Sequence, residues 1–247
     1  MKLFLCGVFC ICLNALAHSQ AIPKSITLAS TDWCPYVCEH QANKPGIIYE
    51  YLTLILKEHG IELSVEFNPW HESVKRANQG LVHGLLTATT DEAPELLFTT
   101  TPTANYQVCF ITKRNQNWLY KDTNSLYGIT LGSIKGYGYG EDIDQYIKDY
   151  AQNPHMQIIE NGGIERLNDM LFSDKINAFL DDSLVVLWLL KDKDVKVKLA
   201  GCLPRKPFFL AINPELPWAN DFMALMDRIL KENPNQRTLH SIKLKYR

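Results

Sequence analysis

The feature that most constrains the fold is a regular alternation of strand-like and helix-like segments, in two successive runs. The first run has strand patterns at 25–30, 61–67, 81–89 and 106–113 and helix patterns at 46–60 and 70–80. The second has strand patterns at 127–134, 156–160, 175–180, 195–200 and 207–213 and helix patterns at 141–151, 164–173, 183–191 and 217–233. Such alternation predicts two small α/β lobes, each with a mostly parallel sheet flanked by helices. Ligands of such sheets bind at the carboxyl ends of the strands, and here also between the lobes.

The N-terminal segment predicts export. Lys2 supplies a positive charge, an apolar run follows at 3–14, and the small-x-small sequence Ala-Leu-Ala ends at Ala17. The run is shorter than the roughly 20 apolar residues that cross a bilayer. We therefore expect a signal peptide within residues 1–21, cleaved after Ala17 or, as the alternative, after Ala21, and a periplasmic product.

Removal of this segment leaves four cysteines, Cys34, Cys38, Cys109 and Cys202. An even number in an oxidising compartment favours disulfides, and Cys34 can pair with Cys38 across a short loop. Two alternatives remain for this pair: free thiols, or a metal site with His40, which would need further ligands. Cys109 and Cys202 can pair or be two buried thiols, and the sequence leaves this open.

Composition excludes several classes of partner and cofactor. The formal net charge is −2, with 46% hydrophobic and 21% charged residues, which is ordinary for a globular chain and gives no basic surface for nucleic acid. The glycine-rich segment 136–140 fits neither nucleotide-binding pattern, and the chain has no G-x-S-x-G or H-E-x-x-H motif. We expect no cofactor, no metal and no catalytic residue.

Five segments, in this order, carry a resemblance to a known family: "DWCPY", "KPGIIYEYLTLIL", "NPWHESVKRANQGLVHGLLTATT", "LYGITLGSIKGYGYGED" and "KINAFLDDSLVVLWL". The chain resembles extracellular solute-binding protein family 3, the periplasmic receptors that deliver polar amino acids to ABC importers. The resemblance covers nearly the whole mature chain. It implies a type II periplasmic binding protein fold that closes like a Venus flytrap, by rigid-body motion of the lobes.

The resemblance also implies domain limits and partners. The first lobe would contain 22–112 and the return segment 206–247, and the second lobe 113–205. Two crossing strands, near 109–115 and 206–212, would form the hinge. The implied partners are a small-molecule ligand and the membrane subunits of an ABC transporter, and the protein would be a monomer.

Carried over residue by residue, the family's pocket falls on Trp33, Tyr36 and Trp70 as aromatic walls and on Thr87 and Thr89 as hydroxyl and backbone contacts. Asp182 falls where a carboxylate holds the ligand's α-ammonium group. Each position also has a structural interpretation. The tryptophans can be core residues, the threonines can be ordinary strand residues, and Asp182 can simply cap the helix that follows.

Two departures change the expected ligand. The family's carboxylate-binding arginine is replaced by Glu92, in "TTDE" at 89–92, and a hydroxyl pair of the second lobe is replaced by Tyr137 and Gly138. Asn177 also replaces an aspartate of the family's motif. A cationic or aromatic solute would suit such a pocket better than a zwitterionic amino acid, unless Lys75, Arg76 or Arg114 reaches the cleft.

The sequence therefore predicts a periplasmic solute-binding protein, and no enzyme. The alternative is a stand-alone sensor or accessory binding protein that is not coupled to transport. A lyase or dehydratase on the same scaffold is a third hypothesis, because a fold does not fix a function. It would need a cleft acid such as Glu92 or Asp182.

Overall fold

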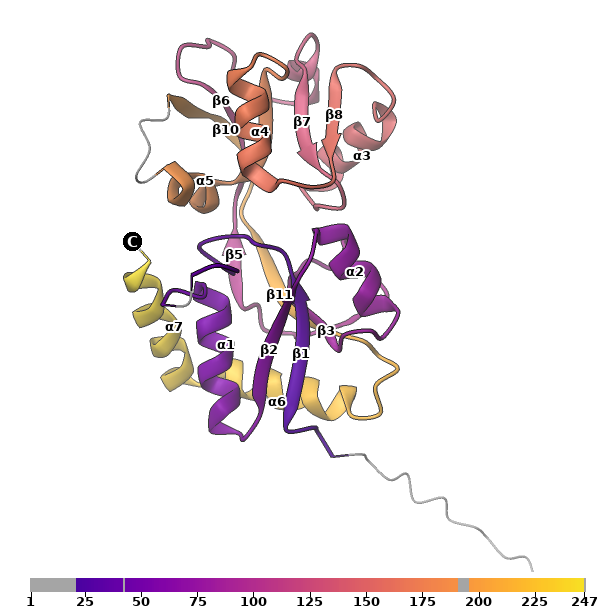
Figure 1. Cartoon of the computed structure of the whole chain (residues 1–247), viewed down its shortest axis with the longest axis vertical. Helices are drawn as coiled ribbons and strands as arrows, with labels where there is room; N and C mark the ends of the chain where they lie inside the picture. The colour runs from indigo at the N-terminus through magenta and orange to yellow at the C-terminus, as the bar shows by residue number, and fades with distance from the viewer. Residues whose placement is uncertain (1–20, 42, 191–195, 247) are drawn as a thin grey trace, which may run out of the picture.

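The computed structural model describes residues 21–41, 43–190 and 196–246, which form two lobes joined by crossing strands (Figure 1). The predicted signal peptide lies outside the described residues, save for residue 21. Within the described ranges, no helix is long and apolar enough to cross a membrane.

The first lobe is an open sheet packed with helices. Its elements are β1 Ser25–Ser30, α1 Ile47–Glu58, β2 Glu62–Phe67, α2 Trp70–Asn78, β3 Gly84–Ala88, β4 Leu97–Phe98, β5 Ala104–Tyr106, β11 Lys206–Ile212, α6 Ala219–Lys231 and α7 Asn233–Lys245. The strand order is β2-β1-β3-β11-β4, and β5 pairs with the start of β11. Helix α1 packs on β2 and β3, and α2 packs on β1 and β3, because each helix buries one apolar stripe.

The second lobe repeats this plan with a smaller sheet. Its elements are β6 Val108–Lys113, a 3₁₀ turn Thr123–Leu126, β7 Leu131–Ile134, α3 Glu141–Asp149, β8 Met156–Ile159, α4 Gly163–Phe172, β9 Ala178–Asp182, α5 Ser183–Leu190 and β10 Val197–Cys202. The strand order is β10-β6-β9-β7-β8. Helices α4 and α5 both contact β9. Strand β9 ends at Asp182, and α5 begins at the next residue.

The predicted α/β two-lobe fold is confirmed, but both sheets are mixed rather than mostly parallel. β1, β2 and β3 are parallel, as are β7, β8 and β9, whereas β11, β6 and β10 run antiparallel to their neighbours. The antiparallel strands are those that enter or leave a lobe. β6 and β11 each enter their sheet from the other lobe, without a helical crossover within the same sheet, so nothing imposes the parallel direction on them. β10 does follow β9 through helix α5, and it is antiparallel only because its neighbour at the sheet edge is β6.

The chain crosses between the lobes twice (Figure 1). β5 pairs with β11 in the first lobe, and β6 starts two residues later in the second sheet, so the first crossing falls at Gln107 and not near residue 112 as predicted. The return lies between the end of β10 and the start of β11. The Cys109–Cys202 disulfide joins the paired strands β6 and β10, with a Cα–Cα distance of 3.9 Å. This bond closes the pairing question that the sequence left open.

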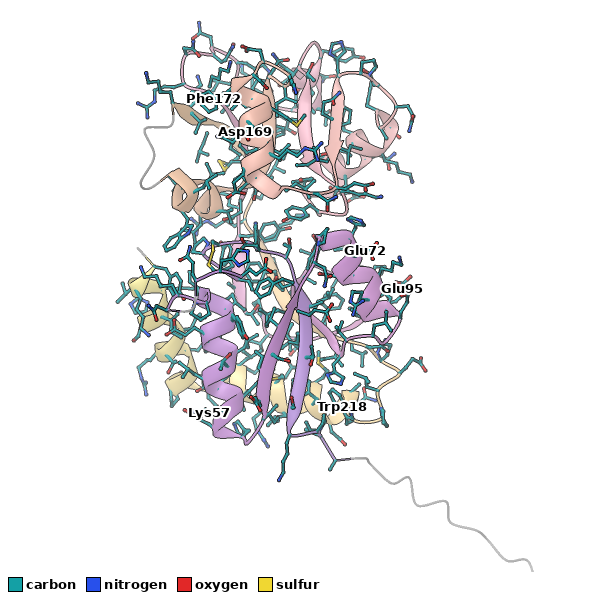
Figure 2. All side chains as sticks on the ribbon, viewed as in Figure 1. Lys57, Glu72, Glu95, Asp169, Phe172 and Trp218 are labelled. Carbon is teal, nitrogen blue, oxygen red and sulfur yellow. A yellow bond between two sulfur atoms is a disulfide. The ribbon has the colours of Figure 1, made fainter. Side chains whose placement is uncertain are left out.

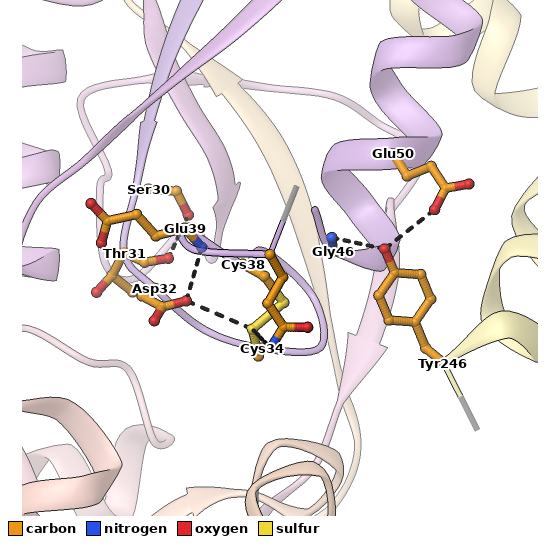
Figure 3. The surroundings of a disulfide bond; sticks show 10 residues. Ser30, Thr31, Asp32, Cys34, Cys38, Glu39, Gly46, Glu50 and Tyr246 are labelled. Carbon is orange, nitrogen blue, oxygen red and sulfur yellow. Dashed lines mark hydrogen bonds between the residues drawn. A yellow bond between two sulfur atoms is a disulfide. The ribbon is translucent and has the colours of Figure 1, made fainter. Parts of the chain in front are cut away.

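Helix α7 was missed, although its sequence carries a helix-start signal. Pro234 stands in its first turn, and Leu239 and Ile242 are buried at helical spacing. The helix packs on α1, and the Tyr246 hydroxyl accepts a hydrogen bond from the Gly46 N–H at 2.9 Å (Figure 3). A Cβ on Gly46 would lie 2.4 Å from the Tyr36 carbonyl oxygen, so the chain needs a glycine at this contact.

Candidate functional site between the lobes

A short closed loop follows β1 and presents Trp33. Cys34 and Cys38 are bridged, which confirms the predicted disulfide (Figure 3). The Trp33 N–H donates to the Val37 carbonyl at 2.8 Å, and the N–H groups of Tyr36 and Val37 donate back to the Trp33 carbonyl at 2.9 and 3.1 Å. The loop is thus closed by both covalent and backbone bonds, which fixes the base of the Trp33 side chain.

A cavity lies between the lobes, where the parallel strands β1, β3, β7 and β9 end. Counted as the space open to the centre of a water molecule, its volume is about 50 Å³, enough for a few waters. Its lining comes from the first lobe (Thr31, Trp33, Trp70, Thr87, Ala88, Thr89, Glu92), the second lobe (Tyr137, Gly138, Tyr139, Asp181, Asp182) and the crossing strands (Tyr106, Val108, Phe208). A larger solute needs the lobes to move apart or the side chains to rearrange.

Most of the predicted site residues meet at this cavity: Trp33, Trp70, Thr87, Thr89, Glu92, Tyr137 and Asp182. Tyr36 is the exception. Its ring lies behind Trp33 with the ring centroids 4.6 Å apart, and its hydroxyl donates to the Asn105 carbonyl at 3.4 Å. The bridged loop turns Tyr36 into the core, where it supports Trp33 instead of lining the cavity.

The two tryptophans combine packing with exposure to the cavity. Trp33 is half-buried and approaches the rings of Tyr106 and Phe208, with centroid distances of 6.3 and 5.8 Å. Trp70 is 5% exposed and packs in an apolar cluster with Leu85 and Ala88. The core and pocket interpretations of Trp70 therefore both hold for the same side chain.

Both carboxylate oxygens of Asp182 accept hydrogen bonds from backbone N–H groups. Its Oδ1 accepts hydrogen bonds from the N–H groups of Leu184 and Val185, at 2.8 and 3.1 Å, and its Oδ2 accepts from the Gln107 N–H at 2.7 Å. It therefore caps α5 and fastens that helix to the first crossing. The structural interpretation of Asp182 accounts for both of its oxygens.

Asp181, which was not among the predicted site residues, has one carboxylate oxygen that accepts no hydrogen bond from the described residues. Its Oδ1 accepts from the Asp182 N–H at 2.7 Å and, across the cleft, from Trp33 Nε1 at 3.3 Å. Its Oδ2 is buried and has no hydrogen-bond partner among the described residues. Burial raises the pKa of Asp181 to about 7, against the lowering effect of those two donors. The doubled aspartate at a strand end was a usable signal, since one carboxylate can cap the helix while the other remains available.

Glu92 connects the lobes. Its Oε2 accepts from the Thr89 N–H at 2.8 Å and from Thr89 Oγ1 at 3.0 Å, and its Oε1 accepts from the Gly138 N–H of the second lobe at 2.8 Å. Burial raises the pKa of Glu92 to about 7, although each of these donors acts to lower it. The carboxyl group that replaces the expected arginine is thus a fully bonded part of the cleft.

Comparison with solved structures identifies the fold. No protein-family model and no curated protein sequence matches the chain. An ancestral arginine-binding protein bound to arginine superposes with a TM-score of 0.75 at 16% identity, over 92% of this chain and 99% of the other. The fold is that of the two-lobed solute-binding proteins.

Two further structures show this fold in different settings. An amino acid ABC transporter substrate-binding protein of Streptococcus pneumoniae, bound to L-arginine, has a TM-score of 0.72 at 16% identity, over 90% of this chain and 94% of its own. A histidine kinase sensor domain with similarity to periplasmic binding proteins has a TM-score of 0.73 at 12% identity, over 90% and 95%. The solute-binding fold is therefore compatible with both transport and sensing.

The electrostatics of this cleft are acidic. Among the described residues, the cavity lining includes the carboxyl groups of Glu92, Asp181 and Asp182 and contains no lysine, arginine or histidine. Arg76 instead pairs with Glu66 at 2.6 Å and Lys75 with Glu72 at 3.5 Å, on the outer side of α2. Arg114 is exposed at the far end of β6 and does not line the cavity either. No cationic side chain of the described lining can hold a ligand carboxylate.

Proposed function

We propose that this protein is a periplasmic solute-binding protein that captures a small organic cation in the cavity between its lobes. The observation that carries the proposal is Asp181, which lines the cavity and whose buried Oδ2 atom has no hydrogen-bond partner among the described residues. A buried carboxylate oxygen without a partner is costly, and an ammonium group would satisfy it with a charge-assisted hydrogen bond.

The cavity walls support the same ligand class. The rings of Trp33 and Trp70 line the cavity together with Tyr106 and Phe208. The faces of aromatic rings attract organic cations, and tryptophan does so most strongly. A substituted amine with an apolar or aromatic body therefore matches both the carboxylate and the walls.

Export and transport are part of the proposal. The signal-like N-terminus and the two disulfides, Cys34–Cys38 and Cys109–Cys202, fit an oxidising compartment outside the cytoplasm. Closure of the lobes around the solute would present one surface, formed by both lobes, to the membrane subunits of an ABC importer. No bond would be made or broken.

A second candidate function is sensing. The similarity to the sensor domain of a histidine kinase supports this candidate, because it places the same fold in a sensor protein. The same cavity and the same ligand class would serve either role, because both require only that closure depends on the ligand. The two roles differ in the partner that reads the closed form.

Calorimetry with matched pairs of ligands tests the proposal. Each pair consists of an amino acid and the amine formed by its decarboxylation, such as tyrosine with tyramine and arginine with agmatine. We expect an amine to bind, to change tryptophan fluorescence and to stabilise the protein by about 2.7 kcal/mol at 100 times its Kd. Tight binding of the amino acids with no binding of the amines would contradict the proposal.

Uptake measurements then separate transport from sensing. If the protein serves an importer, its deletion should abolish uptake of the labelled amine by intact cells. If it serves a sensor, uptake should continue, and only the transcriptional response to the amine should be lost.

A further inference from the structure

Three hydrogen-bond donors from two lobes converge on one carboxyl group of the protein. Thr89 contributes its N–H and its hydroxyl from the end of β3, and Gly138 contributes its N–H from the loop between β7 and α3. Backbone N–H groups arranged in this way form an anion site. That site is occupied by the side chain of Glu92.

The geometry at Gly138 shows how closely the lobes meet here. A Cβ on this residue would lie 2.9 Å from Glu92 Cγ and 3.2 Å from Thr89 Oγ1, so a larger residue would push the loop away from the carboxyl group. The backbone φ of Gly138 is not in the left-handed region, so its glycine serves the close approach and not an unusual conformation. The Tyr106 hydroxyl also donates to the Gly138 carbonyl, at 3.0 Å, so the two peptide groups that flank the Gly138 Cα are both held by hydrogen bonds.

We infer that Glu92 is a built-in occupant of the cleft's anion subsite, which links the lobes and excludes ligands that carry a carboxylate. The inference rests on the proposed solute-binding function and adds a specificity-determining residue to it. A carboxylate ligand would have to displace the Glu92 side chain from all three donors. It would also enter a lining that holds Asp181 and Asp182 and no described cation. A cationic ligand does not compete with Glu92 for these donors, so the Glu92 bonds can form again when the lobes close over it.

The test removes the occupant and supplies a replacement from solution. In Glu92→Ala, the N–H groups of Thr89 and Gly138 lose their acceptor and a space of carboxylate size opens beside them. Acetate should then bind, raise the Tm and compact the protein in small-angle scattering, relative to an equal concentration of chloride. The amino acid of each matched pair should bind at least tenfold more tightly to this variant than to the wild type, because its carboxylate can take the vacated donors.

The controls separate this effect from a general change in charge. Glu95→Gln removes a carboxylate from the same loop, but the Glu95 side chain is exposed on the first lobe (Figure 2) and accepts from Asn78 Nδ2, at 2.6 Å, instead of from the cleft donors. Glu95→Gln should behave as the wild type towards acetate and towards both members of each pair. If Glu92→Ala does not fold, Gly138→Ala serves in its place. It keeps the carboxylate but breaks the approach, and it should loosen the lobes without creating an acetate effect.

Each outcome bears on the inference. A response to acetate in Glu92→Ala, absent from the wild type and from Glu95→Gln, supports it even if no amine has been found to bind, in which case only the proposed function fails. Equal acetate responses in all three proteins would overturn it. So would a wild type that binds the amino acid more tightly than the amine, because Glu92 would then not exclude the carboxylate. With Gly138→Ala in place of Glu92→Ala, scattering and Tm unchanged from the wild type would overturn the inference.

Discussion

Asp181 and Asp182 are neighbours at the end of β9, and they differ in how their oxygens are used. Both side chains line the cavity, and both residues are 2% exposed, so burial does not distinguish them. Asp182 accepts three backbone hydrogen bonds over its two oxygens, whereas Asp181 accepts two bonds on Oδ1 and none on Oδ2 from the described residues. This difference indicates that a carboxylate whose two oxygens already accept hydrogen bonds belongs to the scaffold, whereas one with an oxygen left over is available to a ligand.

The largest effect that we expect is on stability, from Asp182→Ala. This substitution removes the cap of α5 and leaves the Gln107 N–H without its acceptor at the first crossing. Loss of a cap costs about 1 kcal/mol, and a buried donor without a partner costs about 1–3 kcal/mol, so the free energy of unfolding should fall by about 3 kcal/mol. Urea denaturation measures this. A loss of binding with unchanged stability would reverse the assignment of Asp182.

The next effect should fall on binding, from Asp181→Asn. The amide keeps the shape and can still accept from the Asp182 N–H, but it cannot pair with an ammonium group. Removing one partner of a buried charge pair costs about 2–5 kcal/mol, so the Kd of the amine should rise by about thirtyfold or more. The free energy of unfolding should not fall at neutral pH, because the amide replaces a carboxyl group whose ionised form is disfavoured by burial. If Asp181→Asn leaves the Kd unchanged, Asp181 is not the ammonium partner.

Sequence patterns predicted the two lobes and most of the cavity, because strand ends and helix starts are local features. Trp33, Trp70 and the Thr89 region follow or open loops at such ends, and their neighbours in sequence place them at the cleft. The disulfide between Cys34 and Cys38 was also predictable, since the two residues are close in the chain and the sequence predicts export to an oxidising compartment.

The missed features depend on contacts between distant segments. Tyr36 lies behind Trp33 because the bridged loop folds inward, and the Gly138 N–H reaches Glu92 only when the lobes meet. The assignment of roles within Asp181–Asp182 depends on Gln107, 75 residues away from Asp182. The direction of β6 and the position of the first crossing were likewise set by pairing with β9 and β10, which the local pattern does not contain.

The dependence on pH should separate the binding carboxylate from the scaffold. The pKa of Asp181 is raised by burial to about 7, so the fraction of molecules that offer an ionised partner to an ammonium ligand rises as the pH passes through that value. Affinity for the amine should therefore rise about tenfold between pH 6 and pH 8. The stability of the unliganded protein should change in the opposite direction. Between the unfolded pKa of about 3.9 and a pH of about 7, the folded state holds a proton that the unfolded state has lost, so stability falls as the pH rises.

Asp181→Asn is the control for this pH dependence. In this variant the Kd of the amine should change little with pH. The free energy of unfolding should fall less as the pH rises, because one titrating carboxyl group has been removed. A smaller fall should remain, because burial also raises the pKa of Glu92 to about 7. An affinity profile that keeps its full slope in Asp181→Asn would assign the titration to another group.

The smallest effect should come from Trp33→Phe, which tests a side chain that donates to Asp181 across the cleft. Trp33 Nε1 donates to Asp181 Oδ1 at 3.3 Å, and phenylalanine would keep a ring against Tyr36 while losing this donor. A net hydrogen bond contributes about 1 kcal/mol, so the Kd of the amine should rise about fivefold. The bond lowers the pKa of Asp181, so its loss should also move the affinity profile to higher pH.

Trp118→Phe is the matched control. Its Nε1 donates to the Ser125 carbonyl at 2.8 Å, away from the cavity, so that substitution should leave both the Kd and the pH profile unchanged. Equal effects of the two substitutions would show that Trp33 acts through general stability and not through Asp181.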